Sequence, residues 1–183
     1  MAKLVKKVGS KTFYEINSFR AGGLLVFYVD NDKIKILINQ EIRNNNIVYN
    51  LIGGKVDRLD NNIEDTMLRE FNEETGYLAS SLIKDKINSN NLTIKLEKSK
   101  YISQIIEIKP NNRWLNLPKT FSDIFDDVED FGDRDSLKLF WMDLYFDFNN
   151  NNSSYLLIII LSKLKNFSFF KKFDPDNEPL FVD

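Results

Sequence analysis

The chain has 183 residues, and its 25 Lys and Arg against 27 Asp and Glu give a net charge of −2. This balance argues against a protein held to nucleic acid by a strongly basic face. The absence of cysteine and histidine excludes disulfides, zinc sites built on Cys or His, and Ser-His-Asp or Cys-His catalysis. Any metal must therefore be bound by carboxylates, carbonyls and water, which favours Mg or Mn, and any general base must be Asp, Glu, Lys or Tyr.

The first third of the chain predicts β-strands. Short runs rich in β-branched and aromatic residues are bounded by Gly, Asn and Asp turn signals. The strands expected from these runs span residues 3–8, 12–16, 19–29, 33–39 and 47–52. The pair Gly22–Gly23 marks a bend or bulge within the third of them.

A helix is expected after the polar loop of residues 55–62. Ile63, Met67, Leu68 and Phe71 recur at helical spacing, so the helix is expected over residues 63–75. Gly76 follows as a helix stop.

In the rest of the chain, predicted strands and a predicted helix are separated by segments expected to be irregular. Strands are expected at residues 92–96, 101–109 and 137–144, and a helix at 153–165, whereas 110–135 and 173–183 are expected to be irregular. No repeat or clear linker is present, which favours one α+β domain over residues 1–183. The longest apolar run, residues 155–161, is too short to span a bilayer. The N-terminus lacks a signal-peptide core, so we expect a soluble, cytoplasmic protein without a membrane partner.

The end of the helix expected at 63–75 concentrates negative charge. Glu70, Glu73 and Glu74 are three and four residues apart and can reach one side of the helix. Like charges at this spacing repel, and carboxylates near a helix C-terminus oppose the helix dipole. A cluster of charges that the local sequence does not stabilise usually marks a functional site. A divalent cation is the obvious group to compensate the negative charge.

The segment that surrounds these carboxylates resembles the Nudix box of the Nudix hydrolases. The box pattern is G-x5-E-x7-R-E-U-x-E-E-x-G-U, where U is apolar. Its right half matches at Arg69, Glu70, Phe71, Glu73, Glu74, Gly76 and Tyr77. Gly54 fits the first glycine, so the box spans residues 54–77.

The left half of the box departs from the pattern, because the loop between Gly54 and Arg69 is one residue longer. Counting from Gly54 places the first glutamate at Asp60, whereas counting back from Arg69 places it at Asn61. Asp60 is favoured because it keeps a carboxylate, and Glu64, one turn before Leu68, is the other candidate.

The resemblance implies a fold and a reaction. The fold is an α/β/α sandwich around a mixed β-sheet, and the reaction is Mg- or Mn-dependent hydrolysis of a diphosphate bond in a nucleoside diphosphate derivative. By resemblance, Glu70, Glu73 and Glu74 are metal ligands, and Gly54 offers its backbone carbonyl. Arg69 would pair with a box glutamate and orient it. The alternative is a catalytically weak Nudix-fold module that binds a nucleotide, RNA or protein partner.

A further acidic residue outside the box often serves this family as base or metal ligand. The acidic stretch 123–135 offers Glu129, Asp133 and Asp135, and Glu129 is the catalytic candidate carried forward. The alternative for each is a solvated acidic loop.

The segment 110–135 is the expected specificity loop, since loops carry much of a protein's binding function. Trp114 is a candidate for stacking on a base and Arg113 for binding a phosphate, whereas packing of Trp114 onto the core is the alternative. The expected partner is a phosphorylated small molecule or an RNA end, specifically a nucleotide, a dinucleoside polyphosphate or a capped RNA. A second copy of the chain, in a homodimer, is the other partner considered.

Overall fold

The computed structural model describes residues 3–8, 11–15, 19–43, 46–88, 91–125, 136–144, 153, 155–164 and 167–171. The strands are β1 (Lys3–Val8), β2 (Lys11–Glu15), β3 (Ala21–Asp30), β4 (Lys33–Arg43), β5 (Asn46–Asn50), β6 (Ile52–Lys55), β7 (Leu92–Leu96), β8 (Tyr101–Glu107) and β9 (Ser136–Asp143). The helices are α1 (Ile63–Glu74), α2 (Ser80–Ile83), the 3-10 turn η2 (Lys84–Lys86), α3 (Asn112–Leu115), α4 (Leu117–Phe125), α5 (Tyr155–Leu164) and α6 (Ser168–Lys171).

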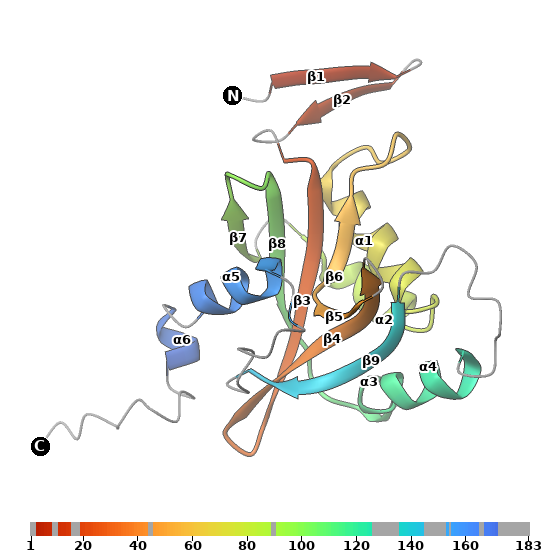
Figure 1. Ribbon diagram of the computed structural model, residues 1–183, viewed down its shortest axis with the longest axis vertical. Helices are drawn as coiled ribbons and strands as arrows, with labels where there is room; N and C mark the ends of the chain where they lie inside the picture. The colour runs from red at the N-terminus through yellow and green to blue at the C-terminus, as the bar shows by residue number, and fades with distance from the viewer. Residues whose placement is uncertain are drawn as a thin grey trace, which may run out of the picture.

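Seven of these strands form one mixed sheet (Figure 1). Its main order is β5-β4-β3-β8-β7, with β6 also paired to β3 and β9 to β4. Strands β3 and β8 run parallel, and the other pairs in this sheet are antiparallel. Strands β1 and β2 form a separate antiparallel pair.

Strand β3 changes its neighbour halfway along its length. Its last residues, 27–30, pair with residues 33–36 of β4, whereas its first residues, 21–24, pair with β6. Strand β4 also pairs with β9 over residues 35–41, and with β5 over residues 39–43. The sheet therefore divides beside β6, the strand that leads into the loop before α1.

Helices cover both faces of the sheet (Figure 1). One apolar cluster joins the sheet to residues of α1, α2, α3 and α4, among them Met67, Phe71, Trp114 and Phe121. A second cluster lies on the other face and includes Leu157, Ile160 and Leu164 of α5 and Phe170 of α6. These two layers confirm the α/β/α sandwich around a mixed sheet.

Capping residues set both ends of helix α1. The Asn62 side chain caps the first turn by accepting a 2.7 Å hydrogen bond from the Asp65 N–H. Gly76 adopts a positive φ of 59°, and the Tyr77 N–H donates to the Asn72 carbonyl over 2.7 Å. This is the hydrogen bond of a glycine-terminated Schellman stop. The helix expected at 63–75 is thus confirmed to within one residue.

Two segments differ from the sequence prediction. The strand expected at 47–52 is two strands, because β5 ends at Asn50 and β6 begins at Ile52. Residues 112–125, expected to be irregular, form α3 and α4. The Asn111 side chain caps α3 by accepting from the Arg113 and Trp114 N–H groups, and Leu117, Phe121 and Phe125 bury one side of α4. A helical period was therefore present but was obscured by the acidic residues around it.

The described helices can also be compared with a bilayer. None of those in the described ranges is both long and apolar enough to cross a membrane. The expected irregular tail, 173–183, lies outside the described residues.

Candidate functional site

Two glutamates of α1 reach the glycines of β6. The Gly53 N–H donates a 2.9 Å hydrogen bond to Oε2 of Glu74. The Glu70 carboxylate lies against Gly54 so closely that a Cβ at position 54 would overlap with it. Gly54 therefore has a steric role, because any side chain would displace Glu70.

Arg69 ties the helix to the preceding loop. Its Nε and Nη2 each lie 3.1 Å from an oxygen of Asp60, and Nη2 also donates to the Lys55 carbonyl over 2.7 Å. Its Nη1 contacts Oε1 of Glu70 at 2.8 Å and Oε2 of Glu73 at 2.9 Å. One guanidinium thus fixes the position of the loop and of two carboxylates, which uses the planar fork that distinguishes Arg from Lys.

Asp60 is the residue, of the three candidates for the first box glutamate, that pairs with Arg69. Its side chain is 4% exposed, and Oδ2 also accepts 2.8 Å hydrogen bonds from the Asp57 N–H and the Thr66 hydroxyl. Burial alone would raise the pKa of Asp60, but the hydrogen bonds from Arg69, Asp57 and Thr66 outweigh it and hold that pKa below its usual value. Asn61 is exposed and instead bonds Asp65.

Glu70 carries a charge that the fold does not fully compensate. Its side chain is 15% exposed, and burial raises its pKa. Arg69 opposes this rise, while Glu73 and Asp60 add to it. The ionised form is therefore less stable in the folded chain than in the unfolded chain, as is common at functional carboxylates.

We expect Glu70→Gln to raise the free energy of unfolding at pH 7 in EDTA. A raised folded pKa means that ionisation opposes folding above that pKa, and the amide removes this charge while it still accepts from Arg69. Urea unfolding of both proteins measures the change. A clear fall in the urea midpoint would show that the ion pair with Arg69 outweighs burial.

Two of the three predicted metal ligands on α1 lie together, and the third does not. Glu70 and Glu74 converge on β6, whereas the Glu73 side chain is 46% exposed and turned toward Arg69. In that part of the chain no three acidic side chains are grouped closely enough to bind a metal by themselves. Carboxylate oxygens suit Mg²⁺, which usually keeps several waters and takes substrate oxygens as ligands. Glu70 and Glu74 are therefore the pair that could hold such an ion.

The two substrate-binding candidates lie in different environments. Arg113 is exposed on α3 and donates to the Ser81 hydroxyl over 3.2 Å. Trp114 is only 2% exposed, meets the Phe71 ring edge to face at 6.4 Å, and its carbonyl accepts from Trp141 Nε1 over 3.0 Å. Trp114 thus has the core-packing role that was the alternative to stacking on a base.

We expect Trp114→Ala to destabilise the fold by about 3–5 kcal/mol, the usual cost of truncating a buried aromatic residue. The ring supports Phe71, on the buried side of the helix that carries Glu70 and Glu74. Chemical denaturation measures the loss. A loss below about 1 kcal/mol would mean that the indole does not pack in the core.

The remaining catalytic candidate, Glu129, lies outside the described residues, as do Asp133 and Asp135. Sequence reasoning also missed two buried polar groups. Tyr101, the first residue of β8, has a buried hydroxyl that lies against Gly23 and Gly53. Glu41, a carboxylate on β4, is almost completely buried. A charged residue on the inward face of a strand was the available signal.

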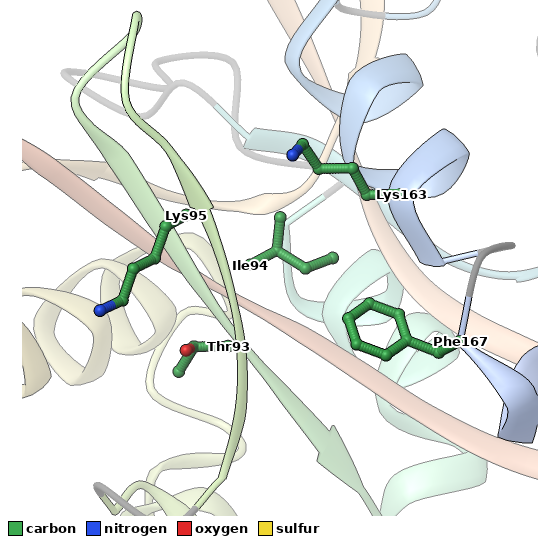
Figure 2. A pocket seen from close by; sticks show the side chains of 5 residues that line it. All are labelled: Thr93, Ile94, Lys95, Lys163 and Phe167. Atoms are coloured by element: carbon green, nitrogen blue, oxygen red, sulfur yellow. The ribbon is translucent and has the colours of Figure 1, made fainter.

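A separate pocket lies on the other side of the sheet. It has a volume of about 300 Å³ and is lined by Thr93, Ile94 and Lys95 of β7 with Lys163 and Phe167 (Figure 2). Ile94 and Phe167 belong to the apolar layer of α5 and α6. This pocket contains none of the carboxylates of α1 and is not the candidate site.

Comparison with known proteins identifies the family of this chain. The NUDIX domain model matches residues 20–130. Among solved structures, a C. elegans Ap4A hydrolase binary complex is similar at 18% identity and a TM-score of 0.45, over 81% of this chain and 100% of that chain. Shewanella oneidensis NrtR with a 27mer DNA is similar at 13% identity and a TM-score of 0.47, over 80% of this chain and 61% of that chain.

A search of curated protein sequences finds no match. The structural likenesses are weak, so the assignment rests on the domain match. Because that match covers more than half of the chain and includes all of β6 and α1, the chain belongs to the Nudix domain family.

Proposed function

We propose that the protein is a divalent-metal-dependent hydrolase that cleaves a diphosphate bond in a nucleoside diphosphate derivative. The observation that carries the proposal is the convergence of Glu70 and Glu74 on the glycines of β6. Glu70 and Glu74 would hold Mg or Mn, and by the family pattern Glu73 and the Gly54 carbonyl would complete the site. Such an ion, when bound, neutralises phosphate oxygens and lowers the pKa of bound water.

Residues of the chain itself hold the catalytic carboxylates in place. Arg69 holds Asp60, the Lys55 carbonyl and Glu70 together, so the Glu70 carboxylate is oriented before substrate arrives. Gly53 and Gly54 let the strand backbone approach the carboxylates. Phosphoryl chemistry of this kind depends mainly on positioning and charge stabilisation, which such a rigid frame favours. Glu129 is proposed as the general base, and the exposed Arg113 as a contact for a substrate phosphate.

The substrates proposed are a nucleotide, a dinucleoside polyphosphate or a capped RNA end. The competing proposal is a module that binds such a ligand without cleaving it. Its motive was the irregular left half of the box. The longer loop still places a carboxylate, Asp60, against Arg69. The irregular left half is therefore a weaker argument for the binding module.

A phosphorus NMR screen with Mg and with Mn tests the proposal. The panel contains nucleoside triphosphates, ADP-ribose, dinucleoside polyphosphates and a capped RNA. We expect turnover of one class that stops when EDTA is added. Turnover that survives EDTA would contradict the proposal, and metal-dependent binding of a panel member without any product would favour the binding module.

A further inference from the structure

Glu41 of β4 is a buried carboxylate with one oxygen unused. Its side chain is 4% exposed, and Oε2 lies 3.0 Å from Nε of Arg43. Its Oε1 is buried and has no hydrogen-bond partner among the described residues. Burial of a charged oxygen without a partner costs stability, so a residue of this kind calls for an explanation in function.

Strand geometry places Glu41 toward the helix that carries the site. Alternate residues of a strand share a face, so Glu41 continues the face of Leu37, two pleats earlier on β4. Leu37 packs in the same cluster as Met67 and Phe71 of α1. Strand β4 also contacts β6, which carries Gly53 and Gly54. Glu41 therefore lies on the face of the sheet that α1 covers, on a strand that contacts β6.

The Tyr101 hydroxyl links the two regions. It is buried without a hydrogen-bond partner in the part of the chain that the structure describes, and a Cβ at Gly53 would lie 2.7 Å from it. Burial raises the pKa of Tyr101 most, and the charges of Glu74, Glu70 and Glu41 raise it further, whereas Arg43 lowers it. The same hydroxyl is thus within electrostatic reach of the proposed metal ligands and of the pair formed by Glu41 and Arg43.

We propose that Oε1 of Glu41 is a substrate-recognition group that accepts a hydrogen bond from an uncharged donor on the nucleoside part of the substrate. This inference rests on the proposed function, since it assumes that the diphosphate lies at Glu70 and Glu74. A third negative group would repel a phosphate, so its ligand must carry an O–H or N–H instead. The donor is a ribose hydroxyl or a ring N–H, because Arg43 leaves only one carboxylate oxygen to accept it.

A metal ligand is the less favoured role for Glu41. The Arg43 guanidinium already lies on the carboxylate and would compete with a cation. Glu41 also joins no group of three acidic residues that could hold a metal within the described ranges.

Calorimetric titration of the full chain in Mg tests this role with uncleavable probes. The probes are methylenediphosphonate and the α,β-methylene analogues of ADP and GDP. We expect Glu41→Gln to weaken binding of a nucleoside probe roughly 10- to 100-fold, as expected for loss of a hydrogen bond to a charged group. Binding of methylenediphosphonate should not change. The exposed Glu97→Gln, the same chemical change in the turn after β7, should leave all three affinities unchanged.

Deoxy and base analogues identify the donor. The 2′-deoxy and 3′-deoxy probes remove a ribose hydroxyl, and 2-aminopurine in place of guanine removes the ring N–H. The probe that lacks the donor should bind wild type more weakly and should bind Glu41→Gln no more weakly than its parent. If every analogue loses the same affinity in both proteins, Glu41 accepts no substrate donor and the inference fails.

Each remaining result has one meaning. If Glu41→Gln weakens methylenediphosphonate as much as the nucleoside probes, Glu41 acts on the diphosphate or metal and the inference is wrong. If wild type binds no methylenediphosphonate in Mg, the proposed function itself fails. Should Glu41→Gln not fold, as judged by thermal melting, Glu41→Asp provides the same test, because it keeps the charge but withdraws the oxygen by one methylene.

Discussion

Glu74→Gln is expected to reduce turnover of the substrate found in the NMR screen by at least roughly 100-fold, because loss of even an outer partner of a metal ligand costs about 10- to 100-fold. The amide can still accept the hydrogen bond from the Gly53 N–H, so the loop and α1 should keep their positions. What the change removes is the negative charge that faces the proposed cation. Initial rates across a range of Mg concentrations measure the loss.

A matched control separates this effect from a general loss of charge. Glu97→Gln makes the same chemical change at an exposed position and should retain wild-type turnover and urea midpoint. Glu74→Gln should also retain the wild-type urea midpoint. Turnover by Glu74→Gln within threefold of wild type would remove Glu74 from the proposed site.

Among the polar substitutions, the largest expected effect on stability is at Asp60. Its Oδ2 accepts from the Asp57 N–H, the Thr66 hydroxyl and Arg69 Nη2, and its Oδ1 accepts from Arg69 Nε. In Asp60→Asn, one of the two oxygens is replaced by an NH₂ group. At either position this group faces N–H or O–H donors and cannot accept their hydrogen bonds. The partly buried Arg69 also loses one of its three carboxylate partners and keeps Glu70 and Glu73. We expect a loss of about 3 kcal/mol in the free energy of unfolding, as for other broken buried pairs.

Urea unfolding of Asp60→Asn beside Asp57→Asn measures this loss. Asp57 is exposed and its carboxylate accepts only one hydrogen bond in the described contacts, from the Leu59 N–H, so its amide variant should lie within about 0.5 kcal/mol of wild type. Equal effects at the two positions would show that the network around Arg69 does not stabilise the fold.

The Asp60 contribution should also depend on pH. Its folded pKa lies below the usual Asp value, so the carboxylate stabilises the fold at pH above the unfolded pKa of about 3.9. The difference between wild type and Asp60→Asn should stay constant from pH 7 to 5. It should shrink as the pH falls below about 4, toward the folded pKa.

Local signals accounted for the elements that build the site. The apolar period at Ile63, Met67 and Phe71 and the glycine at 76 gave the position of α1, because a cap and a helix stop act through neighbours in sequence. The carboxylates at its end were recognised as uncompensated by the same local reasoning. In the structure Glu74 and Glu70 contact β6, and Arg69 contacts Glu70 and Glu73.

Non-local geometry decided what the sequence left open. Counting along the loop could not choose between Asp60 and Asn61, whereas the reach of Arg69 and the burial of Asp60 do choose. Trp114 faces inward only because Asn111 starts a short helix against α1. The Tyr101 hydroxyl lies against Gly53 because β3 exchanges β4 for β6, a change of partner with no signature in either strand.

Mn²⁺ binding followed by electron paramagnetic resonance tests most directly whether Glu70 and Glu74 form a cation site. Wild type, Glu70→Gln, Glu74→Gln and the control Glu97→Gln are titrated with Mn²⁺, without and with methylenediphosphonate. We expect wild type and Glu97→Gln to bind Mn²⁺ alike, and each α1 variant to bind at least about 10-fold more weakly. Equal Mn²⁺ affinity in all four proteins would contradict a metal site at these two glutamates.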